Sequence, residues 1–143
     1  KFDAKRFNEL DNKTLHQIYS LRLEVFVVEQ ECVYQDIDGK DINSIHIIGK
    51  KKEQIIAYSR IMNLNSEFCS IGRVLVKKEL RKKGIGIKLM EKSIEKARKL
   101  YNQKKIKISA QEYLKNFYTD LGFKHTGKRY LEDGIPHIEM TLN

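Results

Sequence analysis

The sequence predicts an α/β fold: a single mixed sheet with helices on both faces. Two observations lead to this prediction. Several short segments alternate apolar and polar residues as strands do, while two longer segments repeat apolar residues every three or four positions as helices do. Along the chain the order is one helix, several strands, and then strand–helix–strand–helix–strand. Such an order favours a layered sheet with helices packed on it.

The N-terminal half is expected to supply the first helix and most of the strands. Residues 2–7 predict a short first strand. Asn12 or Thr14 is expected to cap a helix whose apolar residues recur at helical spacing as far as Phe26. The polar, acidic stretch 31–43 is expected to form a loop. The remaining strands expected in this half are residues 45–49, 54–62 and 69–76.

The C-terminal half is expected to alternate helices and strands. Residues 84–101 predict a helix, and residues 113–121 predict a shorter one that ends at Gly122, a typical C-cap. Between them, residues 106–110 alternate as the interior of a strand. Pro136 is expected to lie between two short extended segments that close the sheet. The expected buried face of the first of these helices is Leu89, Met90, Ile94, Ala97 and Leu100.

Composition limits the class of protein. A chain of 143 residues with 41% hydrophobic and 33% charged residues predicts one globular domain spanning 1–143. No apolar run approaches the roughly 20 residues of a membrane span, and the first residues lack the apolar core of a secretory signal, so no membrane partner is expected. Two cysteines, Cys32 and Cys69, are too few for a disulfide framework and indicate a cytoplasmic protein.

The net charge of +9 fits a nucleic acid partner, an anionic cofactor or simple solubility. The cofactor explanation is favoured by a basic turn between an apolar strand and a helix. The backbone N–H groups at a helix start have no internal partner and, with the helix dipole, form an anion site suited to phosphate. Gly84 and Gly86 would let such a group approach the backbone closely.

Several segments of the chain resemble one known family. The run Arg81-Lys82-Lys83-Gly84-Ile85-Gly86 matches the Arg/Gln-x-x-Gly-x-Gly/Ala signature of the GNAT N-acetyltransferases, and Phe117–Phe123 resembles their second signature, a tyrosine ahead of a Gly-Phe pair. The segments 21–30, 34–41 and 130–138 resemble the ElaA-like branch of that family. The resemblance therefore covers nearly the whole chain.

The resemblance implies the GNAT fold, a mostly antiparallel mixed sheet with a splayed central strand pair. It also implies transfer of an acetyl group from acetyl-CoA directly to a primary amine, with no metal. Pantetheine would lie between the splayed strands, and one backbone N–H would stabilise the oxyanion of the thioester. The cofactor-binding residues that it implies are Val74, Leu75, Val76, Arg81, Lys82, Lys83, Gly84, Ile85, Gly86, Ile87, Lys88 and Gln111.

Tyr118 is the predicted general acid, because a phenol near the sulfur can protonate the leaving thiolate. The general base is less well defined, since the strand at 105–109 lacks the carboxylate that many GNAT relatives place there. Among the candidates, His137 has the ordinary pKa closest to neutrality and is predicted as the second catalytic residue. The other candidates are Glu29, Asp36, Asp38, Asp41, Glu132 and Asp133.

The acceptor side is predicted from charge. Residues 29–41 hold five carboxylates against one lysine in an otherwise basic chain, which would attract an amine. The predicted acceptor-binding residues are Glu29, Asp36, Asp38 and Asp133. Alternatively, Arg22 could join Asp36 and Asp38 as a buried brace between the first helix and the loop. A similar Arg…Val-Phe…Asp arrangement in acyl-homoserine-lactone synthases keeps a non-amine chemistry as a distant alternative.

Two other functional classes stay open. One is a regulatory domain that binds acetyl-CoA without turnover, which the absent strand carboxylate allows. The other is a basic nucleic-acid-binding module, against which stands the lack of an interleaved aromatic platform, a helix-turn-helix or zinc-ligand spacing. The sequence leaves open whether the protein is a monomer or a homodimer.

Overall fold

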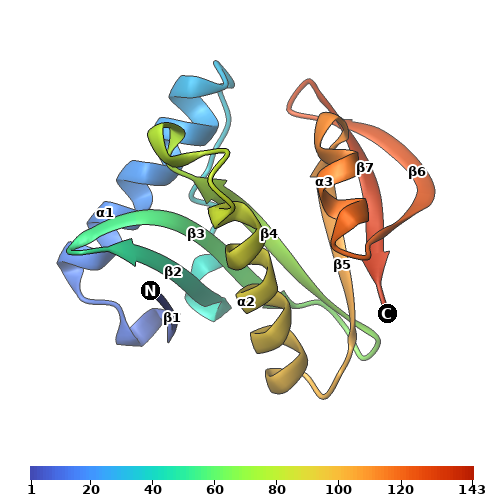
Figure 1. Ribbon diagram of the computed structural model, residues 1–143, viewed down its shortest axis with the longest axis horizontal. Coiled ribbons are helices and arrows are strands. Elements are labelled where there is room, and N and C mark those ends of the chain that lie inside the picture. Colours follow the sequence, from blue (N-terminus) through green and yellow to red (C-terminus); the bar gives the residue numbers. More distant parts are fainter.

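The computed structural model describes residues 1–143 and contains one seven-stranded sheet in the order β1-β2-β3-β4-β5-β7-β6 (Figure 1). Every neighbouring pair is antiparallel except β4 and β5, which are parallel. The mixed, mostly antiparallel sheet is therefore confirmed. Its strands are β1 (Phe2–Arg6), β2 (Ile45–Lys51), β3 (Gln54–Asn63), β4 (Phe68–Val76), β5 (Lys105–Gln111), β6 (Lys124–Glu132) and β7 (Ile135–Leu142).

Helices cover both faces of the sheet (Figure 1). The helix α1 (Asn12–Arg22) packs on one face, while α2 (Ile85–Leu100) and α3 (Lys115–Asp120) pack on the other. Alternate strand residues point to opposite faces, so Ile48 joins the 7-residue core beneath α1 and its neighbour Ile47 joins the 16-residue core beneath α2 and α3. None of the helices combines the length and the apolar character that a membrane span needs.

The central strands β4 and β5 pair over only a short stretch. The paired residues are Phe68 with Lys105, Cys69 with Ile106 and Ser70 with Lys107. Beyond them, β4 continues against β3 and β5 continues against β7, and the two strands diverge (Figure 1). The splayed strand pair is thus confirmed. It leaves the edge of β4 from Ile71 to Val76 without a neighbouring strand on the β5 side.

A β-bulge lies where the strands diverge. Tyr58 of β3 pairs with Leu75 and Arg60 pairs with Gly72, so that a single residue of β3 faces both Arg73 and Val74. Arg73 has a left-handed backbone with a φ of 50°. Because a bulge bends its strand and increases its twist, it helps to turn the end of β4 away from β5.

The first helix differs from the prediction at both ends. Its N-cap is Asp11, whose carboxylate accepts a 2.7 Å hydrogen bond from the Thr14 N–H, so neither Asn12 nor Thr14 is the cap. At the other end, α1 passes directly into a π-helical segment, Leu23–Glu29. The apolar spacing indicated that a helix continues to Phe26 but carried no signal for the wider π turn.

Two features of the C-terminal half also differ from the prediction, and one agrees with it. Leu100 is exposed, whereas Ser93 is buried on α2 and lies 2.7 Å from the Ser59 hydroxyl of β3. Pro136 lies within β7 rather than between two segments. The chain reverses instead at Asp133–Gly134, where both residues have positive φ as a two-residue hairpin turn requires. Gly122, with a φ of 102°, follows the end of α3 as predicted.

Candidate functional site

The turn before α2 is open to an anion. Gly84 occupies the N-cap position with a φ of 78°, and a Cβ there would meet no atom within 4 Å. A Cβ on Gly86 would touch Phe117 of α3 at 3.5 Å and Val76 of β4 at 3.8 Å, which is ordinary contact. The first hydrogen bond within the helix joins Lys88 N to Gly84 O, and no side chain caps the N–H groups before it. These N–H groups are therefore free to bind phosphate oxygens.

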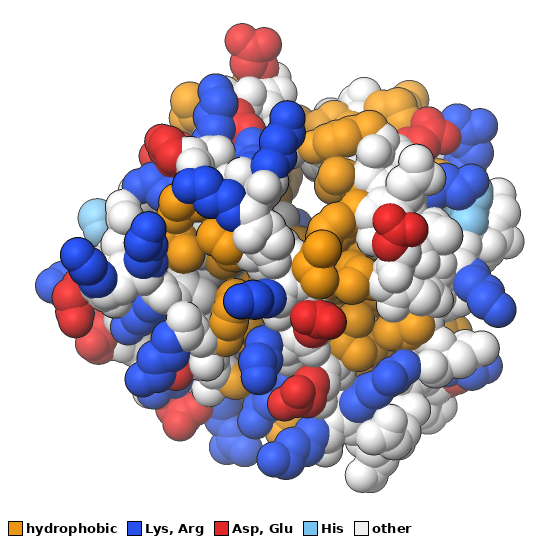
Figure 2. Space-filling model, viewed as in Figure 1, with side chains coloured by type: hydrophobic (Ala, Val, Ile, Leu, Met, Phe, Trp, Pro, Cys, Tyr) orange, Lys and Arg blue, Asp and Glu red, His pale blue; other side chains and the backbone are white.

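Positive charge surrounds this turn. Lys82, Lys83 and Lys88 are all exposed and close to it in the chain. Figure 2 shows lysines and arginines spread over α2, with a band of apolar side chains beside it toward α3. A polyanion at the helix N-terminus would thus meet lysines as well as backbone N–H groups.

Arg81 is already engaged by the protein. Its Nε donates to the Val76 carbonyl at 2.9 Å, its Nη2 donates to Glu29 Oε1 at 2.8 Å, and its Nη1 donates to the other oxygen of Glu29. The hydrogen bond from Arg81 lowers the pKa of Glu29. Arg81 therefore joins the end of β4 to the end of the π-helical segment, and Glu29 is not a free carboxylate.

Tyr118 lies on α3, beside the gap between β4 and β5. Its neighbour Phe117 reaches across to Gly86, and the ring of Tyr118 packs edge-on against both Phe117 and Phe123. The side chain is buried, which raises the pKa of the phenol, so it stays protonated at neutral pH. Its hydroxyl makes no hydrogen bond within the protein yet is not sealed from solvent. These properties suit a proton donor.

The chain around Glu29 and the turn at Asp133, two of the predicted acceptor-binding residues, approach each other at the open end of the gap. Gln111, the last residue of β5, donates from Nε2 to Gln30 Oε1 at 3.3 Å. Cys32 Sγ lies 3.5 Å from the carbonyl of Asp133 in the β6–β7 turn. His137 is paired with Gln111 across the β5–β7 ladder. The structure therefore brings Glu29, Gln111, Asp133 and His137 to one region.

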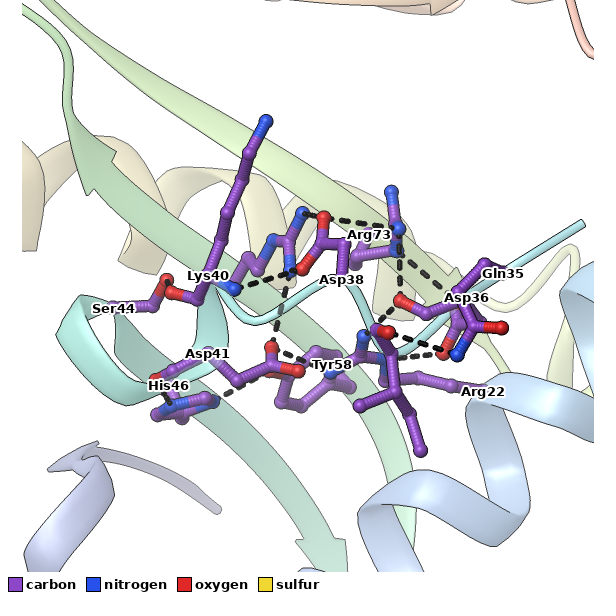
Figure 3. Close-up of polar contacts among 12 residues, drawn as sticks. Arg22, Gln35, Asp36, Asp38, Lys40, Asp41, Ser44, His46, Tyr58 and Arg73 are labelled. Atoms are coloured by element: carbon purple, nitrogen blue, oxygen red, sulfur yellow. Dashed lines mark hydrogen bonds and ion pairs between the residues drawn. The ribbon is translucent and has the colours of Figure 1, made fainter.

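The remaining predicted carboxylates belong to a different arrangement, the arginine–aspartate cluster, which consists of Arg22, Arg60, Arg73, Asp36, Asp38 and Asp41. Figure 3 labels all of these residues except Arg60. Asp36 lies 2.9 Å from both Arg22 Nε and Arg73 Nε, and it accepts a 2.5 Å hydrogen bond from Tyr34. Asp38 receives two hydrogen bonds from Arg60, at 2.9 and 2.7 Å. Asp41 lies 2.7 Å from Arg22 and 3.1 Å from Arg60.

This cluster corrects the prediction for Asp36 and Asp38. The side chain of Asp36 is fully buried, and both oxygens of Asp38 are held by Arg60. Three arginines balance three aspartates, so the loop does not present the negative charge that its sequence suggested. Although partial burial opposes it, hydrogen bonding to Arg60 and to the Lys40 N–H lowers the pKa of Asp38. The buried brace, considered as the alternative, is confirmed for Arg22 and Asp36, but the second partner of Arg22 is Asp41, whereas Asp38 pairs with Arg60 and Arg73.

Sequence reasoning missed Arg60 and Arg73 as members of this cluster. A signal for Arg60 was present, because it lies inside the apolar strand 54–62, where a charge requires a buried partner. Nothing local marks Arg73, whose position depends on the bulge in β4. Through Arg73, the cluster holds the strand edge that borders the gap.

Residues 9–143 match the family model of the acetyltransferase (GNAT) domain. The chain belongs to the GNAT acetyltransferase family. Among its GNAT relatives, protein ElaA of Escherichia coli is 42% identical over 137 residues, which cover 93% of this chain and 90% of ElaA. A UPF0039 protein of Schizosaccharomyces pombe is 41% identical over 144 residues, covering 99% of this chain and 96% of that protein.

Solved GNAT structures agree closely with this one. The crystal structure of Escherichia coli ElaA matches with a TM-score of 0.94 and 39% identity, covering 100% of this chain and 99% of ElaA. An acyl-CoA N-acyltransferase from Pseudomonas aeruginosa matches with a TM-score of 0.93 and 35% identity, again covering 100% and 99%. This GNAT protein is therefore an acyltransferase.

Proposed function

We propose that this GNAT protein transfers an acetyl group from acetyl-CoA directly to a primary amine. The observation that carries the proposal is the position of the β4–β5 gap beside the open N-terminus of α2. The gap offers an extended strand edge to an amide-containing chain, and the helix N-terminus offers N–H groups to phosphate at one end of it. Acetyl-CoA combines these two features in one molecule.

The residues present fit this cosubstrate. In the proposal, the N–H groups from Ile85 to Ile87 hold the pyrophosphate, with charge from Lys82, Lys83 and Lys88. The edge of β4 from Val74 to Val76 bonds the pantetheine amides, and Gln111 borders the far end. Arg81 borders this cosubstrate site, because its hydrogen bond to the Val76 carbonyl holds it at the end of β4. The relative from Pseudomonas aeruginosa, an acyl-CoA N-acyltransferase, supports an acyl-CoA in this role.

Direct transfer needs three things of the protein. A backbone N–H of β4 polarises the thioester carbonyl and stabilises the oxyanion that forms when the amine attacks. Tyr118 donates a proton to the departing thiolate. Its raised pKa keeps the phenol protonated at neutral pH, so this proton is available. His137 accepts a proton from the amine. Asp133 and the Arg81–Glu29 pair border the opening through which the acceptor enters.

Two measurements test the proposal. Calorimetry with acetyl-CoA should show binding that weakens with salt, since phosphates meet lysines. A thiol-release assay with a panel of amines, including small amines, aminoglycosides and peptides with free N-termini, should identify an accepted class. Binding without thiol release from any amine would favour the regulatory domain. No binding of acetyl-CoA, with tight binding of a nucleic acid, would contradict the proposal altogether.

A further inference from the structure

Four polar side chains gather on the open face of β5, β7 and β6, and we call them the His137 cluster: Ser109, Tyr130, Glu132 and His137. Their strand neighbours Ile108, Ala110 and Ile138 pack into the core beneath α2 and α3. Because side chains alternate along a strand, Ser109 and His137 face the opposite side. His137 itself is buried, whereas Glu132 is half exposed.

The hydrogen bonds determine which nitrogen of His137 carries its proton. Nδ1 lies 2.7 Å from the Ile135 carbonyl, which can only accept, so Nδ1 is the donor. In the neutral ring, Nε2 therefore presents a lone pair. This lone pair faces Glu132 Oε2 at 3.5 Å, so that two acceptors point at the same space. A group that donates two N–H bonds would satisfy both of them.

Glu132 is held from its other side. Its Oε1 lies 3.4 Å from the Ser109 hydroxyl, which must donate because a carboxylate only accepts. Ser109 is in turn hydrogen-bonded to the Tyr130 hydroxyl, which is then the donor. The Tyr130 ring stacks on the His137 ring with 6.1 Å between centroids. The arrangement therefore orients both acceptors.

The cluster borders the proposed acyl-transfer gap. His137 pairs with Gln111, which reaches Gln30 on the other side of the opening. The residue after Glu132 is Asp133, whose carbonyl contacts Cys32. Other charged groups on this face include Lys107 and Glu139, which lie 4.0 Å apart, and Lys128, whose Nζ lies 5.8 Å from the centroid of the Tyr130 ring.

We propose that Glu132 and His137 form the binding site for the ammonium group of the acceptor and remove its proton. The inference rests on the proposed function and deepens it. The ammonium donates to Glu132 and to His137 Nε2, and His137 takes one proton to give the neutral amine and an imidazolium that Glu132 stabilises. The amine nitrogen then forms the C–N bond as the C–S bond breaks. Tyr118 donates its proton to the thiolate, and the second proton of the amine then restores the Tyr118 phenol. The proton on His137 leaves to solvent.

The binding step is tested without acetyl-CoA, so that it does not depend on turnover. The probe is n-butylammonium chloride, and the readout is the NMR signal of the His137 ring in protein carrying nitrogen-labelled histidine. Saturable changes in this signal are expected. Glu132→Gln should weaken binding roughly two- to fivefold, as suits a half-exposed charge pair. Glu139→Gln removes an equal charge from the same face and should leave the affinity unchanged.

Tetramethylammonium, which has no N–H, should leave the His137 signal in place. The site is overturned if n-butylammonium causes no change at tens of millimolar, or if Glu139→Gln weakens binding as much as Glu132→Gln does.

Turnover supplies a second, separate test with any amine that releases thiol. His137→Gln should lower kcat by about 10²–10⁴-fold and remove the acid limb of the pH profile. Glu132→Gln should chiefly raise the KM of the amine. An unchanged kcat and pH profile in His137→Gln would overturn the catalytic part. A wild-type protein that binds n-butylammonium at His137 but releases no thiol would contradict the proposed function instead.

Discussion

Arg81 and Glu29 form a bidentate ion pair that links the turn before α2 to the end of the π-helical segment. The third donor of Arg81, Nε, holds the carbonyl of Val76 at the end of β4. One side chain thus connects the proposed cosubstrate site with the proposed acceptor opening. Its pKa is raised by the hydrogen bond to Glu29, so the pair stays ionised across the neutral range.

This arrangement predicts that Arg81 acts mainly on the acceptor side. Lysine keeps the charge but cannot form the bidentate contact, so Arg81→Lys should raise the KM of the amine about two- to fivefold. Acetyl-CoA affinity should change little. Lys83→Ala, the comparison variant, should weaken acetyl-CoA binding in a salt-dependent way and leave the amine KM alone. Equal losses of acetyl-CoA affinity in the two variants would mean that Arg81 binds phosphate directly.

Gly86→Glu should abolish acetyl-CoA binding while the protein stays folded. The new Cβ makes only ordinary contacts with Phe117 and Val76, and glutamate favours a helix more than glycine does. The carboxylate, however, would lie where phosphate is expected. Calorimetry measures the loss, and Lys92→Ala, an equal change of charge further along α2, is the control. Unchanged affinity in a folded Gly86→Glu protein would contradict the phosphate site.

Tyr118→Phe should lower kcat by about 10²–10⁴-fold and preserve acetyl-CoA affinity, because the ring that packs on Phe117 and Phe123 is kept. Burial holds the pKa of Tyr118 above its ordinary value. The wild-type rate should therefore show no fall from phenol ionisation at neutral pH. Tyr113→Phe, at an exposed tyrosine nearby, should turn over normally. A wild-type rate in Tyr118→Phe, with chemistry rate-limiting, would make Tyr118 a structural residue.

The arginine–aspartate cluster predicts a large loss of stability on Asp36→Asn. The change removes one of the two negative partners of the fully buried Arg22, the other being Asp41, and breaking a buried pair in this way costs about 3–5 kcal/mol. Urea unfolding measures it. Glu24→Gln, at an exposed carboxylate two residues after Arg22, should cost far less. Similar midpoints for the two variants would show that the buried pairs contribute little.

The lowered pKa of Asp38 predicts how the stability of the folded protein depends on pH. Its pKa is lower in the folded protein than in the unfolded chain, so its contribution is complete above the ordinary aspartate range and is lost as the pH falls below that range. Asp38→Asn should therefore reduce stability at neutral pH and flatten the decline on acidification. Unfolding free energies measured from neutral pH down to strong acid would test this, and parallel curves for wild type and variant would contradict it.

Much of the fold followed from local pattern. The alternation of Ile106, Ile108 and Ala110 identified β5, and the spacing of Leu89, Met90 and Ala97 identified the buried face of α2, because these periods come directly from strand and helix geometry. The basic glycine turn at Gly84 was predictable because its glycines and lysines are adjacent in the chain and lie between an apolar strand and a helix. The pair Asp133-Gly134 is typical of a two-residue hairpin turn, but the prediction placed the break between the two strands at Pro136 instead.

The sequence by itself determined the family, the order of the elements and the glycine turn before α2, since each depends on residues that are close in the chain. Only the tertiary structure decided what the carboxylates do. Asp36 and Asp38 lie among acidic residues in sequence, yet Arg22, Arg60 and Arg73 come to them from three other elements. Glu29 likewise meets Arg81, 52 positions away. Whether a charge attracts a substrate or neutralises a neighbour is determined by such long-range contacts, and no local pattern records them.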